Sequence, residues 1–140
     1  MKKLNQLLAD ITAIKVVGNA EVEITSVTND SREAKPGALF IAVKGVAVDA
    51  HKFIPQVVAA GAAAVVCEDL PENLNDTVTY IQVADSTIAL AHLASAWYDH
   101  PSTKLRLVGV TGTNGKTTTA TLLYELTQSL GHKAGLLSTA

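Results

Sequence analysis

A glycine-rich segment between an apolar run and a helical pattern constrains this chain most. Residues 105–110 read LRLVGV, an apolar run that predicts a β-strand. Residues 116–130 repeat apolar side chains at helical spacing, and Gly131 follows as a helix stop. The side chains on this helical face are Ala120, Leu123, Leu126 and Leu130. The order strand, glycine loop, helix is typical of a parallel α/β unit.

Residues 109–118 read GVTGTNGKTT and have the composition of a phosphate-binding loop. Glycines let backbone N–H groups approach an anion closely, and the start of a helix adds unpaired N–H donors. Lys116 would bring positive charge to the terminal phosphates as the catalytic residue, and the Thr117 hydroxyl would bind Mg²⁺. The predicted nucleotide contacts are Gly112, Thr113, Asn114, Gly115, Lys116, Thr117 and Thr118.

The loop departs from the general pattern G-x-x-x-x-G-K-[ST] at one position. That pattern has glycine where this chain has Val110, and Gly109 lies one residue too early. The alternative is an ordinary glycine-rich turn with a solvated Lys116. The joint presence of a strand, Gly-Lys-Thr and a helix favours phosphate binding.

The residues before this unit alternate predicted helices and strands. Apolar spacing predicts a short opening helix through Leu4 and Ile11, a helix from Ile54, and a helix capped by Asp85 or Ser86. Strands are predicted at 21–27, 39–43, 63–67, 80–83 and, near the end, 134–137. The polar, proline-containing stretch 99–103 is interpreted as a linker. An α/β chain with domains at 1–101 and 102–140 follows.

Composition excludes several classes of function. The net charge is -2, with 11 basic and 13 acidic residues and no basic stripe, so nucleic-acid binding is not expected. No apolar run reaches the roughly 18 residues of a membrane span, which favours a soluble cytoplasmic protein. The four histidines have no metal-ligand spacing, and the single cysteine is interpreted as a buried thiol.

Three segments resemble the Mur ligase family. Residues 108–119 resemble its ATP loop, T-G-T-x-G-K-T-[ST], in which Val110 is usual. Asp30-Ser31-Arg32 with the segment 36–42 resembles its D-S-R…G-x-L-F-x-A motif, and residues 45–54 resemble G-x-x-x-D-G-H-x-F-I with Ala50 replacing a glycine. Folylpolyglutamate synthetases share a similar loop. The asparagine of the loop and the run 105–110 are most similar to the MurE type.

The resemblance implies a fold and an activity. The fold would be a small mixed-sheet domain, 1–101, that binds the UDP part of a substrate, followed by the start of a P-loop parallel-sheet ATPase domain, 102–140. The activity would be ATP- and Mg²⁺-dependent ligation of a diamino acid, meso-diaminopimelate or L-lysine, to UDP-N-acetylmuramoyl-L-alanyl-D-glutamate through an acyl phosphate, in peptidoglycan synthesis. The implied substrate contacts are Asn29, Ser31, Val46, Ala47 and Val48.

Other interpretations stay open at the level of sequence. Arg32 would brace its loop or touch the ligand, and His51 would hold a loop near the substrate. A MurF-type ligase, a folylpolyglutamate-type ligase and a non-catalytic UDP-sugar or nucleotide-binding module are the alternatives. We expect the 140 residues to be a fragment that is monomeric and inactive alone, because the amino-acid site and further Mg²⁺ ligands would lie outside them.

Overall fold

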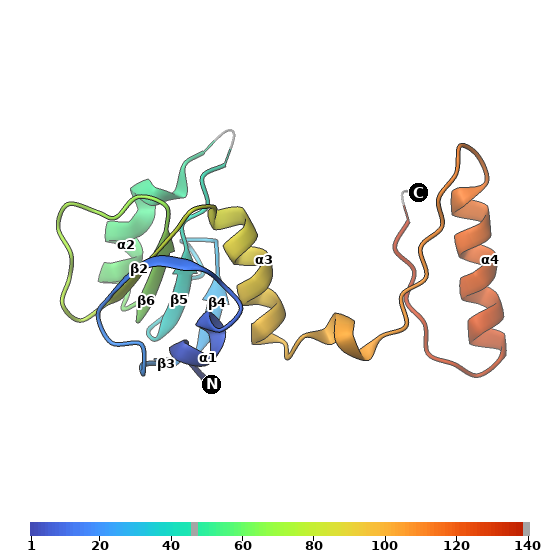
Figure 1. The fold of residues 1–140 in the computed structure, drawn as a ribbon, viewed down its shortest axis with the longest axis horizontal. Helices are drawn as coiled ribbons and strands as arrows, with labels where there is room; N and C mark the ends of the chain where they lie inside the picture. Colours follow the sequence, from blue (N-terminus) through green and yellow to red (C-terminus); the bar gives the residue numbers. More distant parts are fainter. Residues whose placement is uncertain (46–47, 139–140) are drawn as a thin grey trace. The chain divides into compact units, whose positions relative to one another are not determined.

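The computed structural model describes residues 1–45 and 48–138. The chain divides into two compact units, Met1–Thr103 and Lys104–Ala140 (Figure 1). The change from one unit to the next therefore comes directly after the proline-containing stretch 99–103.

Unit 1 is built on a mixed sheet. Its strand order is β2-β7-β6-β5-β4, in which β4 to β7 are parallel and β2 is an antiparallel edge. The strands are β2 (Ala13–Val17), β4 (Ser26–Thr28), β5 (Ala38–Ile41), β6 (Ala64–Cys67) and β7 (Thr79–Val83). A two-residue ribbon pairs β1 (Lys2–Lys3) with β3 (Glu23–Ile24). The predicted small mixed-sheet α/β fold is confirmed.

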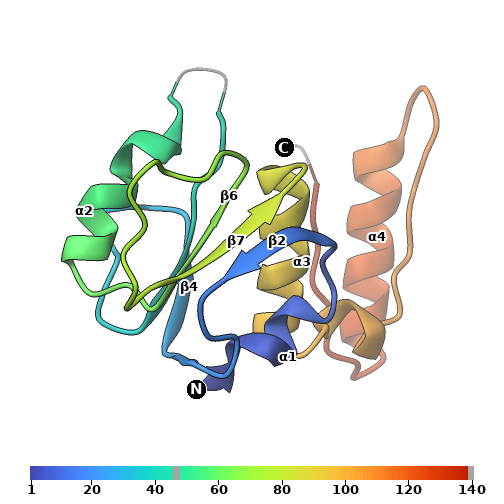
Figure 2. The same cartoon turned by 60° about the vertical axis from the view of Figure 1, so that its left-hand side comes forward.

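Helices cover both faces of this sheet (Figure 2). They are α1 (Leu4–Leu8), α2 (Ile54–Ala59) and α3 (Ser86–Trp97), with 3₁₀ turns η1 (Ala50–Phe53) and η2 (Pro101–Lys104). Successive strand side chains point to opposite faces. Leu39 and Ile41 therefore join the core beneath α1 and α3, whereas Phe40 and Ala42 join the core beneath α2.

Burial on both faces explains why β5 and β6 are continuous apolar runs. Each has four consecutive buried residues, as expected for central parallel strands. Asp85 caps α3, since its Oδ1 accepts from the backbone N–H groups of Thr87 at 2.8 Å and Ile88 at 2.9 Å. The cap was predicted as Asp85 or Ser86, and Asp85 performs it.

Two sequence predictions for unit 1 need correction. The single strand predicted at 21–27 is two short strands, β3 and β4, in different sheets. Strand β2 was not predicted, although its residues AIKVV are rich in β-branched side chains. Because β2 is the exposed edge of the sheet, its apolar and polar residues do not alternate cleanly.

Unit 2 contains one helix, α4 (Lys116–Ser129), among its described residues. The helix ends as predicted: Gly131 has a φ of 82°, and its N–H donates to the Gln128 carbonyl while the His132 N–H donates to that of Thr127. The strands predicted at 105–110 and 134–137 are wrong for this structure, in which both segments are irregular. A strand needs a neighbour for its hydrogen bonds, and no described segment pairs with either one.

Candidate functional site

An open cavity of about 570 Å³ lies beside the ends of β4 and β5 in unit 1. The carboxyl ends of parallel strands meet at one edge of a sheet, where α/β proteins commonly bind ligands. One wall comes from residues 29–32, directly after β4. The other wall includes Val43, Gly45, Val48, Ala50 and Phe53, which follow β5. We call this cavity the groove.

The groove gathers predicted residues that are distant in sequence. Asn29 and Ser31 line one wall, and Val48 lines the other. Val46 and Ala47, also predicted as substrate contacts, lie outside the described residues. The two walls together offer an amide, a hydroxyl and apolar surface, which suit a polar ligand with an aromatic or sugar ring.

An ion pair within the first wall shapes its loop. The Asp30 carboxylate accepts from the backbone N–H of Arg32 at 2.9 Å and from Arg32 Nε at 2.9 Å. The Arg32 side chain, and then its backbone N–H, lower the pKa of Asp30 to about 2. Arg32 thus braces the loop as one interpretation expected, and its exposed side chain also borders the groove.

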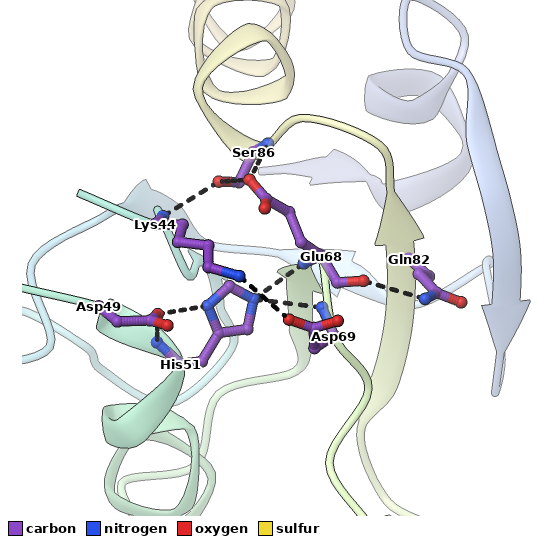
Figure 3. Close-up of polar contacts among 7 residues, drawn as sticks. All are labelled: Lys44, Asp49, His51, Glu68, Asp69, Gln82 and Ser86. Carbon is purple, nitrogen blue, oxygen red and sulfur yellow. Dashed lines mark hydrogen bonds and ion pairs between the residues drawn. The ribbon is translucent and has the colours of Figure 1, made fainter. Parts of the chain in front are cut away.

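Behind the second wall, a polar network joins the segments that follow β5, β6 and β7 (Figure 3). His51 Nδ1 lies 2.6 Å from Asp49 Oδ1, and His51 Nε2 accepts from the backbone N–H of Glu68 at 2.9 Å. Glu68 Oε1 accepts from the Ser86 N–H at 3.0 Å and from the Ser86 hydroxyl at 2.7 Å. These two bonds from Ser86, the backbone one first, lower the pKa of Glu68. Lys44 N–H donates to Ser86 Oγ at 3.2 Å.

Sequence reasoning identified only part of this network. It named His51 as a loop-holding residue and Ser86 only as a possible helix cap, and it did not name Glu68. Glu68 and Ser86 lie 18 positions apart in sequence, and Lys44 and Ser86 lie 42 apart. The only sequence signal for the network was weak, since it consists of polar residues that directly follow buried parallel strands.

The predicted phosphate loop in unit 2 has a left-handed entry to its helix. Gly115, the N-cap of α4, has a φ of 76°, and Gly112 has a φ of 148°, which side-chain-bearing residues rarely adopt. Lys116 Nζ donates to the carbonyls of Gly112 at 2.6 Å and Thr113 at 3.2 Å. The ammonium group therefore lies over the loop, and Thr117 is the second residue of the exposed first turn of α4.

The glycine loop, Lys116 and Thr117 fit a nucleoside triphosphate with Mg²⁺. The unpaired N–H groups of the first turn favour an anion, and the Thr117 hydroxyl is a suitable Mg²⁺ ligand alongside phosphate oxygens. Among the residues that the structure describes, no group of three His, Cys, Asp or Glu side chains is arranged to hold a metal. In this segment, Thr117 is the residue that the sequence predicts as a Mg²⁺ ligand. No helix in the described ranges is long and apolar enough to cross a membrane.

Comparison with known families decides the chain's membership. The family model described as Mur ligase family, catalytic domain, matches residues 23–98, more than half of the chain. The chain belongs to the Mur ligase family. The suspected resemblance is confirmed, and the match lies within unit 1.

Individual Mur ligases match over nearly the whole chain. The UDP-N-acetylmuramoyl-L-alanyl-D-glutamate--2,6-diaminopimelate ligase of Bacteroides fragilis is 52% identical over 137 residues, and that of Cytophaga hutchinsonii is 53% identical over 139. Each match covers 98% of this chain and 28% of the relative, so the chain spans under a third of their length. The crystal structure of MurF from Acinetobacter baumannii is 29% identical, with a TM-score of 0.64 over 91% of this chain and 28% of that one.

Proposed function

We propose that the whole protein is an ATP-dependent ligase that joins 2,6-diaminopimelate to UDP-N-acetylmuramoyl-L-alanyl-D-glutamate in peptidoglycan synthesis. The observation that carries this proposal is the identity of about half of all residues to ligases of that name over 98% of the chain. The relatives favour diaminopimelate over L-lysine, the other diamino acid that the sequence left open. We further propose that it acts in the cytoplasm and as a monomer.

Unit 1 would bind the UDP part of the substrate in the groove. Ser31 would donate its hydroxyl to a phosphate or uracil oxygen, and Asn29 would offer both a donor and an acceptor. Val48 would contribute backbone groups and van der Waals contact, as would Val46 and Ala47. Arg32, already paired with Asp30, would keep the loop in shape.

Unit 2 would begin the ATP site. The backbone N–H groups of residues 112–118 would bind the phosphates, and Lys116 would leave the Gly112 and Thr113 carbonyls to contact the β- and γ-phosphates. Mg²⁺, bound through Thr117 and phosphate oxygens, would supply further charge neutralisation. Lys116 would stabilise the charge that develops as the γ-phosphoryl group passes to a substrate carboxylate. The incoming amine would then displace phosphate from the acyl phosphate.

An amine-dependence assay on the whole protein tests this function. ADP formation should require both UDP-N-acetylmuramoyl-L-alanyl-D-glutamate and diaminopimelate, and L-lysine should substitute poorly. A requirement for D-alanyl-D-alanine with a tripeptide precursor would indicate a MurF-type ligase, and glutamate with a folate would indicate a folylpolyglutamate-type ligase. Binding of the UDP substrate without any ADP formation would indicate a non-catalytic module.

The 140-residue chain itself gives a second test. It should bind the UDP substrate through unit 1 and should release no ADP with the complete set of substrates. Ser31→Ala should weaken this binding, while Ser102→Ala, at an exposed serine of η2, should not. Amine-dependent ADP release by the chain alone would contradict the proposed division of labour.

A further inference from the structure

His51 lies in the segment that forms the second wall of the groove, and its imidazole ring contacts the chain directly after β6 (Figure 3). The side chain of His51 is only 14% exposed, and its two nitrogens contact two different parts of unit 1. Nδ1 faces Asp49 in the wall segment, and Nε2 faces the chain directly after β6. His51 itself does not line the groove as described, so any influence on a ligand must pass through the wall.

The hydrogen bonds fix the protonation of this ring. Nε2 accepts from two backbone N–H groups, those of Glu68 at 2.9 Å and Asp69 at 3.3 Å. A backbone N–H can only donate, so Nε2 must carry a lone pair and no proton. The ring proton then lies on Nδ1 and is donated to Asp49 Oδ1. The ring is the neutral Nδ1–H tautomer, and both of its nitrogens are satisfied.

Backbone hydrogen bonds on either side of His51 close the base of the wall. Asp49 pairs with Lys44 across an antiparallel bridge, and its Oδ1 also accepts from the His51 N–H at 2.9 Å. Ala50 N–H donates to the Val43 carbonyl at 3.0 Å, and Gly45 N–H donates to that of Val48 at 3.1 Å. Gly45, Val48 and Ala50 all line the groove. The position of this wall relative to the sheet is therefore set where His51 and Lys44 attach to neighbouring segments.

The charged groups around the ring reinforce the attachment. Lys44 Nζ lies 3.5 Å from Asp69 Oδ2, which links the wall to the same turn that His51 contacts. Glu68 turns its carboxylate to Ser86 and its carbonyl to Gln82 Nε2 at 2.9 Å. The turn after β6 is thus fixed to β7 and to the start of α3, and it offers a rigid anchor.

We propose that His51, as the neutral Nδ1–H tautomer, is a positioning residue that fixes the second wall of the groove for the UDP substrate. The inference rests on the proposed function, because it assigns the groove to that substrate. A loop held in its bound conformation loses less entropy on binding, so the anchor raises affinity without touching the ligand. Its effect should fall on the UDP substrate and not on ATP, whose loop lies in the other unit.

Steady-state kinetics on the whole protein tests the proposal with three substitutions. His51→Ala should raise KM for the UDP substrate about tenfold, with kcat and the KM for ATP changed less than about twofold. His51→Gln should recover most of this loss, because its amide oxygen accepts near the position of Nε2. His51→Asn keeps a donor near Nδ1 but is too short to reach Glu68, so it should resemble alanine. His92→Ala, at an exposed histidine of α3, should change nothing.

A second readout addresses the ring directly. In ¹⁵N NMR of the 140-residue chain, His51 should show a protonated Nδ1 and an unprotonated Nε2 at neutral pH, whatever the enzyme's activity. A proton on Nε2 would overturn the proposal.

An unchanged KM for the UDP substrate in His51→Ala, with an active wild type, would also overturn the proposal, because the ring would then be only a structural brace. A wild type that does not bind the UDP substrate would overturn the proposed function and the positioning role together. Trp97 fluorescence confirms that each variant is folded.

Discussion

The candidate sites of unit 1 and unit 2 differ in how deeply the residues around them are buried. The groove lies on a sheet whose central residues, such as Phe40 and Val65, are completely buried. In unit 2 none of the described residues is buried, and Leu107, Val108 and Leu126 are each more than half exposed. A phosphate loop can nevertheless take its shape, because two glycines and a helix start define it locally. A strand cannot form in the same way, because its hydrogen bonds belong to a neighbour.

Hydrogen exchange on the 140-residue chain should show the largest effect of this difference. Amides of β5 and β6 should exchange only by global unfolding, at about 5 kcal/mol or more. Amides of α4 should exchange at close to zero protection free energy, since a helix of 14 residues is marginal without packing. Protection of α4 equal to that of β6 would show that unit 2 has a core of its own.

A pair of leucine truncations should separate the two units next. Leu93→Ala removes a fully buried side chain from the core beneath α3 and should cost about 2–5 kcal/mol of unfolding free energy. Leu126→Ala, at a leucine of α4 that is 54% exposed, should change it by less than about 0.5 kcal/mol. Urea unfolding followed by Trp97, which packs against that core, measures both. Equal losses of unfolding free energy in the two variants would contradict the difference in burial between the units.

The helix starts should differ as well, though by less. Asp85→Ala removes two hydrogen bonds at the start of α3 and should cost about 1 kcal/mol of unfolding free energy, whereas Asp85→Asn keeps the capping oxygen and should cost little. Helix α4 begins at Gly115 with no side-chain cap, so its start relies on backbone conformation. Thermal unfolding of both Asp85 variants checks this, and an asparagine variant as unstable as alanine would argue against the cap.

The smallest expected effect is electrostatic and confined to the first wall of the groove. Asp30 has its pKa lowered to about 2 by Arg32, below its ordinary value. A lowered pKa means that the Asp30–Arg32 contact stabilises the loop above about pH 4 and is lost as the pH falls towards 2. Arg32→Gln should raise the Asp30 midpoint towards its ordinary value in a carboxyl NMR titration, and Lys35→Gln should not. A midpoint unmoved by Arg32→Gln would exclude the brace.

Sequence patterns predicted most of the structural features that neighbouring residues determine, such as helix caps and helix stops. The Asp85 cap and the Gly131 helix stop depend on nearby residues, and the apolar run 63–67 showed its strand by composition alone. Strand β2 escaped prediction because an exposed edge strand carries no clean alternation. The segment 105–110 has the composition of a strand but no partner among the described residues, so propensity alone was misleading.

Some residues of the candidate sites were predicted from the sequence, and others became evident only in the fold. Asn29, Ser31 and Val48 were inferred from family resemblance, and the fold brings them to one groove. Whether they contact the substrate stays a prediction. The contact between Glu68 and Ser86 was not foreseen, because it joins segments that follow separate strands and no local spacing in the sequence encodes it. His51 was foreseen as a loop holder, but its partners required the fold.

Lys116→Ala in the whole protein tests most directly whether the two units divide substrate and phosphate binding as proposed. Loss of its charge should lower the rate of ATP-dependent ligation by about 10²–10³, the effect of removing about 2.7–4 kcal/mol of transition-state stabilisation. Affinity for the UDP substrate, measured by calorimetry, should change little, whereas Ser31→Ala should weaken that affinity and leave ATP binding largely intact. Turnover of Lys116→Ala within about threefold of the wild type would contradict the phosphate-loop assignment, since a contact of this kind is worth far more.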